Sequence, residues 1–314
     1  MKAVLHATVV LAAVVAAATL NSVTRAQTFR AGVDAVQVDV LVTRGGRPVG
    51  GLTAADFELR DSGVVQSVDA VAEGDVPVTL SLVLDASQSV AGQPLDHLRN
   101  AIGAAAEALA AEDRLSLLTF SHHIDHASGP TADVAQVRAA ADAMTAEGAT
   151  ALYDAAFAGL ALRDRVEGRM VMLLFSDGAD TASWLDPRAV ITAAQRSDVV
   201  VYGVTLQQVA ERENLAAVAR IPREQQWFAQ EPTLFGRQFL PLLAAETGGA
   251  VLVAERSEQL RETFVRVLRD FKSRYILTYT PQGVAPDGWH PIEVRLKSGA
   301  ADVAARRGYL RGRN

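Results

Sequence analysis

An unbroken apolar segment that ends in an aspartate sets the strongest limit on the fold of this chain. Residues 79–89 read Thr-Leu-Ser-Leu-Val-Leu-Asp-Ala-Ser-Gln-Ser. Apolar side chains with little alternation predict a strand buried on both faces, which is typical of a parallel sheet covered by helices. Asp85 then lies at the carboxyl end of this strand, the edge at which open α/β sheets bind ligands.

Two serines follow Asp85 at alternate positions. The Asp-x-Ser-x-Ser spacing of Asp85, Ser87 and Ser89 allows one loop to direct three oxygens at a common point. Because oxygen ligands alone favour a hard cation, the segment predicts a site for Mg²⁺, Ca²⁺ or Mn²⁺. Each residue by itself also has a structural explanation, since Ser and Asp cap helices and form turns.

Two later segments carry the same kinds of side chain. Thr150 follows a glycine and precedes an apolar pattern with helical spacing, which places its hydroxyl near a helix start. Residues 171–178, Val-Met-Leu-Leu-Phe-Ser-Asp-Gly, form a second apolar segment that stops at Asp177, where the next glycine permits a tight turn. The candidate metal ligands are therefore Asp85, Ser87, Ser89, Thr150 and Asp177.

This order of motifs, Asp-x-Ser-x-Ser, then Gly-x-Thr, then an apolar strand ending in Asp-Gly, resembles a von Willebrand factor type A domain with a metal-ion-dependent adhesion site. The resemblance implies that Ser87, Ser89 and Thr150 contact the metal directly. It implies that Asp85 and Asp177 reach the metal through water or hydrogen-bond the serines. A cation held mainly by neutral hydroxyls keeps an open coordination position. The resemblance implies that an Asp or Glu carboxylate of a protein partner fills this position.

The rest of the chain predicts two structural regions. Alternating strand and helix patterns over residues 78–272 predict an α/β fold with a doubly wound, mostly parallel sheet flanked by helices. The segments 27–77 and 273–314 are expected to be β-rich and to fold together as one small β module. Residues 51–59, Gly-Leu-Thr-Ala-Ala-Asp-Phe-Glu-Leu, resemble the leader of a group of bacterial exported proteins related to the type A domain.

Residues 1–26 have the pattern of a signal peptide, with a positive start, an apolar segment and a small-x-small motif that ends at Ala26. We therefore expect export to a periplasm or the cell exterior, without membrane insertion after cleavage; a membrane anchor is the alternative. The chain has no cysteine, which excludes disulfides and cysteine metal ligands. A net charge of −6 without a long run of one sign gives no indication of nucleic-acid binding.

Catalysis is the main alternative to binding. The chain lacks the Gly-x-Ser-x-Gly, phosphate-loop, dinucleotide and His-Glu-x-x-His motifs, so an enzyme is not expected. A metal-dependent hydrolase stays open because a bound cation can activate water. An envelope scaffold with a purely structural site is a third interpretation.

Four other features invite a functional interpretation. In the segment 121–126, Ser-His-His-Ile-Asp-His, strand alternation would send the adjacent histidines to opposite faces, which argues against a second metal site. Trp184 is either an anchor for a partner or a helix-packing residue. The long connection at 211–235 is a candidate to cover or flank the metal face. Arginines near the end indicate a solvated terminus or a docking patch: Arg306, Arg307, Arg311 and Arg313.

Overall fold

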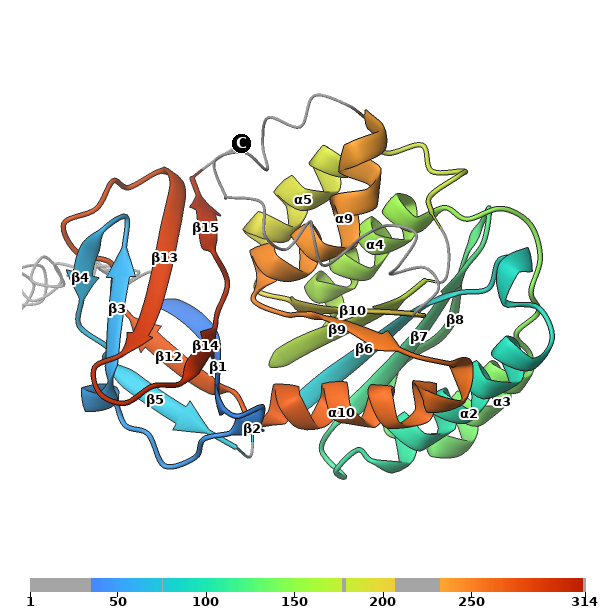
Figure 1. The fold of residues 1–314 in the computed structure, drawn as a ribbon, viewed down its shortest axis with the longest axis horizontal. Helices are drawn as coiled ribbons and strands as arrows, with labels where there is room; N and C mark the ends of the chain where they lie inside the picture. Colours follow the sequence, from blue (N-terminus) through green and yellow to red (C-terminus); the bar gives the residue numbers. More distant parts are fainter. Residues whose placement is uncertain (1–34, 75, 177–178, 207–231, 313–314) are drawn as a thin grey trace, which may run out of the picture. The chain divides into compact units, whose positions relative to one another are not determined.

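The computed structural model describes residues 35–312 except residue 75, residues 177–178 and residues 207–231, and in the helix that begins at residue 232 it describes side chains from residue 238 onward. The predicted signal peptide and most of the long connection at 211–235 lie outside the described residues. Three sheets organise the described part of the chain (Figure 1).

The central sheet has the strand order β11-β10-β9-β6-β7-β8. All neighbours pair in parallel except β7 and β8, which are antiparallel. Every residue of β6 and β9 is buried, as their continuous apolar sequences predict. The strands are β6 (Val78–Asp85), β7 (Arg114–Phe120), β8 (Ile124–Thr131), β9 (Arg169–Phe175), β10 (Val200–Leu206) and β11 (Val251–Ala254).

Helices cover both faces of this sheet. Figure 1 shows α2 (Gln93–Glu107), α3 (Val134–Asp142) and α10 (Leu260–Lys272) below it. Above it lie α4 (Leu152–Ala161), α5 (Pro187–Arg196) and α9 (Pro232–Thr247). Leu82 and Leu84 pack into the lower core and Val83 into the upper one, so one strand supplies both layers. The predicted doubly wound α/β fold is thus confirmed.

Short helical turns complete the described elements: η1 (Ala54–Asp56), η2 (Gln88–Val90), η3 (Leu162–Arg165) and η4 (Ser257–Gln259). Within the described ranges, no helix is both long and apolar enough to cross a membrane.

A β module contains strands from both ends of the described chain, as the sequence predicts. One sheet has the order β14-β1-β12-β5 with β2 beside β1, and the other has the order β15-β13-β3-β4. Strand pairs join the early and late segments, since β1 pairs with β12 and β3 with β13. The strands are β1 (Val36–Arg44), β2 (Arg47–Pro48), β3 (Phe57–Asp61), β4 (Val64–Gln66), β5 (Ala70–Glu73), β12 (Tyr275–Tyr279), β13 (Gly288–Leu296), β14 (Asp302–Ala304) and β15 (Gly308–Arg311).

A buried carboxylate ties the β module together. Asp61 is fully buried and accepts four side-chain hydrogen bonds, at 2.8 to 3.0 Å, from Tyr279, Tyr309, Ser62 and His290. Burial raises the pKa of Asp61, but the hydrogen bonds outweigh it and hold the pKa below its ordinary value. Burial and the same carboxylate raise the pKa of Tyr309 to about 12. The cluster therefore keeps a negative charge in the interior of the module.

Arginines connect the β module to the central α/β layers. Arg274, which follows α10, donates to the Tyr202 hydroxyl at 3.0 Å and to the Gly248 carbonyl at 2.6 Å. The interpretation of the late arginines as a solvated terminus is wrong for two of them. Arg306 donates to the Gln195 carbonyl of α5 at 3.0 Å, and Arg307 lies 3.4 Å from a carboxylate oxygen of α9.

Candidate metal centre

Asp85 ends β6 and is fully buried. Its Oδ1 accepts a hydrogen bond from the backbone N–H of Ser87 at 2.9 Å, which is the local turn that an aspartate favours. Its Oδ2 accepts from the hydroxyl of Ser176 at 2.8 Å. Ser176 directly follows β9, the parallel neighbour of β6, so the carboxylate joins two strand ends as well as orienting the loop after it.

The two serines of the Asp-x-Ser-x-Ser motif converge. The Oγ atoms of Ser87 and Ser89 lie 2.8 Å apart. Ser87 is 1% exposed, whereas Ser89, in the middle of η2, is exposed. The pair therefore joins a buried serine to an exposed one, at the strand end where the sequence predicts a ligand site.

Backbone hydrogen bonds hold the segment of Thr150 against the loop after Asp85. The N–H of Glu147 donates to the Ala86 carbonyl at 2.9 Å, and the N–H of Gln88 donates to the Gly148 carbonyl at 3.0 Å. Thr150 is 6% exposed and lies two residues before α4. These bonds hold the segment before Thr150 against the loop that carries Ser87 and Ser89.

Asp177 lies outside the described residues, but the loop after it is described from Ala179 onward. Thr181 binds Thr150 from this loop. The N–H of Thr150 donates to Thr181 Oγ1 at 3.0 Å, and the N–H of Thr181 donates back to the Thr150 carbonyl at 2.8 Å. Sequence reasoning missed both Ser176 and Thr181. The position of Ser176 at a predicted strand end was a signal, whereas nothing in the sequence marks Thr181.

The same loop displays an aromatic side chain. Asp154, in the first turn of α4, accepts hydrogen bonds from the backbone N–H groups of Trp184 at 3.0 Å and Leu185 at 2.9 Å. The Trp184 side chain is 95% exposed. Of the two predicted roles for Trp184, helix packing does not match this exposure.

The histidine pair lies in the turn between β7 and β8. The rings of His122 and His123 meet edge to face with centroids 4.6 Å apart, and Ser121 Oγ lies within 3.4 Å of Nδ1 of each. The prediction that the two side chains point to opposite faces is wrong, because a turn closed by the Ser121 N–H and the His123 carbonyl interrupts the alternation. No group of three or more His, Cys, Asp or Glu side chains that could hold a metal occurs in the described parts of the chain.

The donor set of the candidate metal centre fits a hard divalent cation. Two hydroxyl oxygens lie 2.8 Å apart beside a buried carboxylate, and Thr150 follows a segment whose backbone is hydrogen-bonded to the same loop. All of these donors are oxygen, which favours Mg²⁺, Ca²⁺ or Mn²⁺ over softer metals. Ser87, Ser89 and Thr150 would hold the ion, with Asp85 orienting the serines.

Residues 79–233 match the family model of the von Willebrand factor type A domain. The match begins in β6, ends in α9 and includes all five predicted ligand positions. The parallel sheet with helices on both faces has the type A fold. Type A domains are in general interaction modules. A comparison with the curated proteins found no match.

Several solved structures resemble this chain. A von Willebrand factor type A protein from Catenulispora acidiphila is 12% identical, with a TM-score of 0.49 over 86% of this chain and 76% of the other. The type A domain of the pilus tip protein Mfa5 from Porphyromonas gingivalis is 12% identical, with a TM-score of 0.46 over 68% of this chain and 99% of that domain. Proximal thread matrix protein 1 from the mussel byssus is 15% identical, with a TM-score of 0.47 over 67% of this chain; the chain spans about half (49%) of the mussel protein.

Proposed function

We propose that this chain is an exported protein that binds a divalent cation and uses it to bind a carboxylate of a protein partner. The proposed ligand positions are Asp85, Ser87, Ser89, Thr150 and Asp177. The observation that carries the proposal is the convergence of the Ser87 and Ser89 hydroxyls at 2.8 Å beside the buried carboxylate of Asp85. The match of residues 79–233 to the type A domain supports an interaction function, and the pattern of residues 1–26 supports export.

The charge of the proposed site explains why it would bind an anionic group of a partner and not catalyse a reaction. Neutral hydroxyls leave most of the positive charge on a bound ion, so a further anionic ligand is favoured. Mg²⁺ is the expected ion, with Ca²⁺ and Mn²⁺ as alternatives that also prefer oxygen. An acidic side chain of the partner would complete the coordination.

Exposed aromatic surface beside the proposed site supports a protein as the partner. Trp184 is 95% exposed on a loop that Asp154 holds from α4. The same loop binds Thr150 through Thr181. Because Trp side chains are enriched among residues that dominate interface energies, Trp184 is a suitable contact for a partner that has reached the cation.

Calorimetric titration of metal-free residues 27–314 tests metal binding. We expect saturable binding of Mg²⁺, Mn²⁺ or Ca²⁺ by the wild type and loss of binding in the Ser87→Ala, Ser89→Ala double variant. Ser298→Ala, which removes an exposed serine in another turn, is the matched control and is expected to bind like the wild type. Absence of binding by the folded wild type would leave a scaffold role and exclude the proposed cation.

Affinity capture from cell-envelope and culture-medium extracts tests the partner. Proteins retained by the wild type in Mg²⁺ should be released by a chelator and should not be retained by the double variant. Retention that is unchanged by either treatment would exclude a metal-bridged contact.

A further inference from the structure

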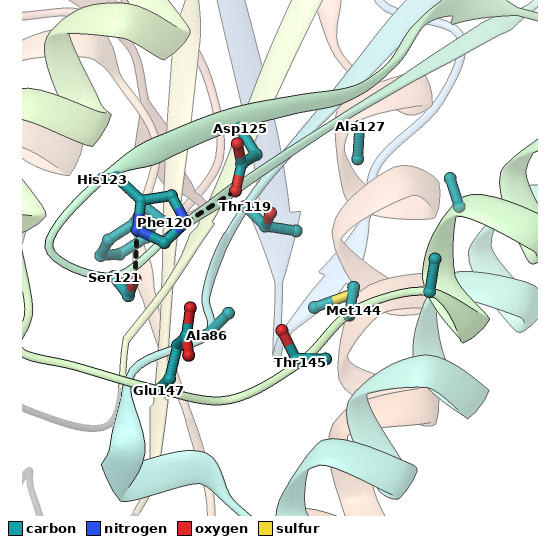
Figure 2. Close-up of a pocket in the computed structure, with 12 residues that line it drawn as sticks. Ala86, Thr119, Phe120, Ser121, His123, Asp125, Ala127, Met144, Thr145 and Glu147 are labelled. Carbon is teal, nitrogen blue, oxygen red and sulfur yellow. Dashed lines mark hydrogen bonds and ion pairs between the residues drawn. The ribbon is translucent and has the colours of Figure 1, made fainter.

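We propose that a cavity beside the candidate metal centre binds a lysine or arginine side chain of the same partner whose carboxylate meets the cation, an inference that rests on the proposed function. The cavity has a volume of about 280 Å³. Figure 2 shows its lining, and the main residues of the argument are Ala86, Thr119, His123, Asp125, Met144 and Glu147.

The cavity and the candidate metal centre share a wall. Ala86, which lines the cavity, lies between Asp85 and Ser87 in the chain. Glu147, which also lines it, donates its backbone N–H to the Ala86 carbonyl at 2.9 Å. One short segment of a partner can therefore present an acidic residue to the cation and a second side chain to the cavity.

The lining of the cavity favours a positive charge. It contains two carboxylates, Asp125 and Glu147, against one imidazole, that of His123. His123 Nε2 lies 2.9 Å from Asp125 Oδ2, whereas the Glu147 carboxylate has no ion pair or side-chain hydrogen bond with the residues that the structure describes. A positively charged group is attracted here, and a second carboxylate of the partner is repelled. The lining therefore selects a basic side chain, whereas the metal site selects an acidic one.

A buried threonine, Thr119, also lines the cavity. Thr119 is 8% exposed, and its side chain makes no hydrogen bond to any of the described residues. Thr119 pairs directly with Asp125 across β7 and β8, which places the two side chains on the same face. Ammonium and guanidinium groups only donate hydrogen bonds, so this hydroxyl and the two carboxylates supply the acceptors that they need.

The remaining walls favour an aliphatic stem over a bare metal ion. They are formed by small or flexible apolar side chains, those of Ala86, Ala127, Ala140, Ala143 and Met144. Lys and Arg bury their methylene groups along such surfaces while the charged end stays at polar groups. The combination of apolar walls and acidic acceptors is the complement of a basic side chain.

Methionine methyl signals in NMR can test the cavity directly. Met144 lines it, while Met170 and Met172 lie in the core on β9 and serve as internal references. Butylguanidinium chloride, added to metal-free protein labelled at the methionine methyls, should shift the Met144 signal saturably and leave the references in place. Butyrate and 1-pentanol, of similar length but anionic or neutral, should not produce this shift at the same concentrations.

Charge variants test whether the acidic side chains of the lining cause the binding of butylguanidinium. The Asp125→Asn, Glu147→Gln double variant is expected to weaken butylguanidinium binding about tenfold or more, since it removes both charged acceptors. Glu112→Gln removes an exposed carboxylate at the opposite end of β7 and should bind like the wild type. Equal shifts with 1-pentanol, or unchanged affinity in the double variant, would overturn the proposal.

A peptide series tests the link to the metal. In acetylated peptides, glycines of varied number separate one glutamate from one arginine, and a parallel series has norleucine in place of arginine. With Mg²⁺, at least one arginine peptide should bind about tenfold more tightly than its norleucine counterpart, and the Asp125→Asn, Glu147→Gln variant should abolish the difference. Binding of butylguanidinium without any arginine advantage would overturn the shared-partner proposal. Binding of butylguanidinium with no Mg²⁺-dependent peptide binding at all would place the failure in the proposed carboxylate function.

Discussion

The hydroxyl of Ser176 donates a hydrogen bond to Asp85 Oδ2 at 2.8 Å, between the ends of the adjacent parallel strands β9 and β6. Both residues are buried, at 3% and 0% exposure. The other carboxylate oxygen orients the loop of the two serines through the Ser87 N–H. Ser176 therefore acts on the proposed ligands through Asp85, without belonging to the motif.

Ser176→Ala should weaken Mg²⁺ binding about tenfold, the effect typical of losing a group that orients a metal ligand. Calorimetric titration measures it. Ser116→Ala is a matched control, because Ser116 is also buried on a central strand but has no hydrogen-bond partner for its hydroxyl among the described residues. Equal Mg²⁺ affinity in Ser176→Ala and the control would show that Asp85 needs no such support.

Gly148→Ala should disturb the loop that carries Thr150. Gly148 has φ of +73°, and an added Cβ would lie 2.0 Å from His122 Nδ1. Backbone strain of this kind costs about 1–3 kcal/mol, and the clash adds to it. Urea unfolding measures the loss of stability, and weaker Mg²⁺ binding should accompany it.

A second glycine separates strain from clash. Gly51 has φ of +77° and no atom within 4 Å of an added Cβ, so Gly51→Ala reports the strain alone. If Gly148→Ala lowers the free energy of unfolding no more than Gly51→Ala does, the His122 ring moves aside freely. The prediction that the clash disturbs the loop of Thr150 would then be wrong.

Trp184→Ala should leave stability within about 0.5 kcal/mol of the wild type, because the side chain is 95% exposed. Capture of the Mg²⁺-dependent partner should fall by a factor that corresponds to about 2 kcal/mol, as for a central aromatic contact. Val65→Ala removes an exposed apolar side chain of the β module and serves as the control for surface changes. Capture that is identical in both variants would remove Trp184 from the interface.

Asp61→Asn should destabilise the β module by about 2–3 kcal/mol at neutral pH, since charged hydrogen bonds to a buried acceptor are weakened. The folded state lowers the pKa of Asp61 from 3.8, so its contribution is present above pH 3.8 and is lost as the pH falls through the lower, folded-state pKa. The stability difference between wild type and variant should therefore shrink in acid. Urea unfolding at neutral and acidic pH measures this difference in stability. Asp302→Asn, at an exposed site, is the control. A difference between wild type and Asp61→Asn that stays constant as the pH falls would contradict the charge argument.

Sequence patterns predicted the central layers well because burial on both faces leaves few alternatives. Continuous apolar segments such as Val78–Asp85 have to lie between two layers of helices. The antiparallel edge strand Ile124–Thr131 lacks this signal, since five of its eight residues are exposed and it contains Gly129 and Pro130. An edge strand needs only one partner and tolerates such residues.

The positions of the candidate residues were predictable where they follow strand ends, whereas the contacts between distant loops were not. The sequence placed Asp85, Ser87, Ser89 and Thr150 in position by local rules. The contacts of Thr181 with Thr150 depend on how two distant loops pack, for which periodicity contains no information. The metal-ligand roles of these residues, and that of Asp177, stay predictions until the titrations are made.

Strand β1 pairs with β12, and the whole α/β unit lies between these two strands in the sequence. The β module therefore cannot form until almost all of the chain is available. Closing so long a flexible loop would be slow and entropically costly, but a folded α/β unit holds the two ends near each other beforehand. Unfolding of that unit would restore the cost and separate β1 from β12. Loss of the central sheet should therefore open the β module in the same transition, which makes the two regions one cooperative unit despite their separate cores.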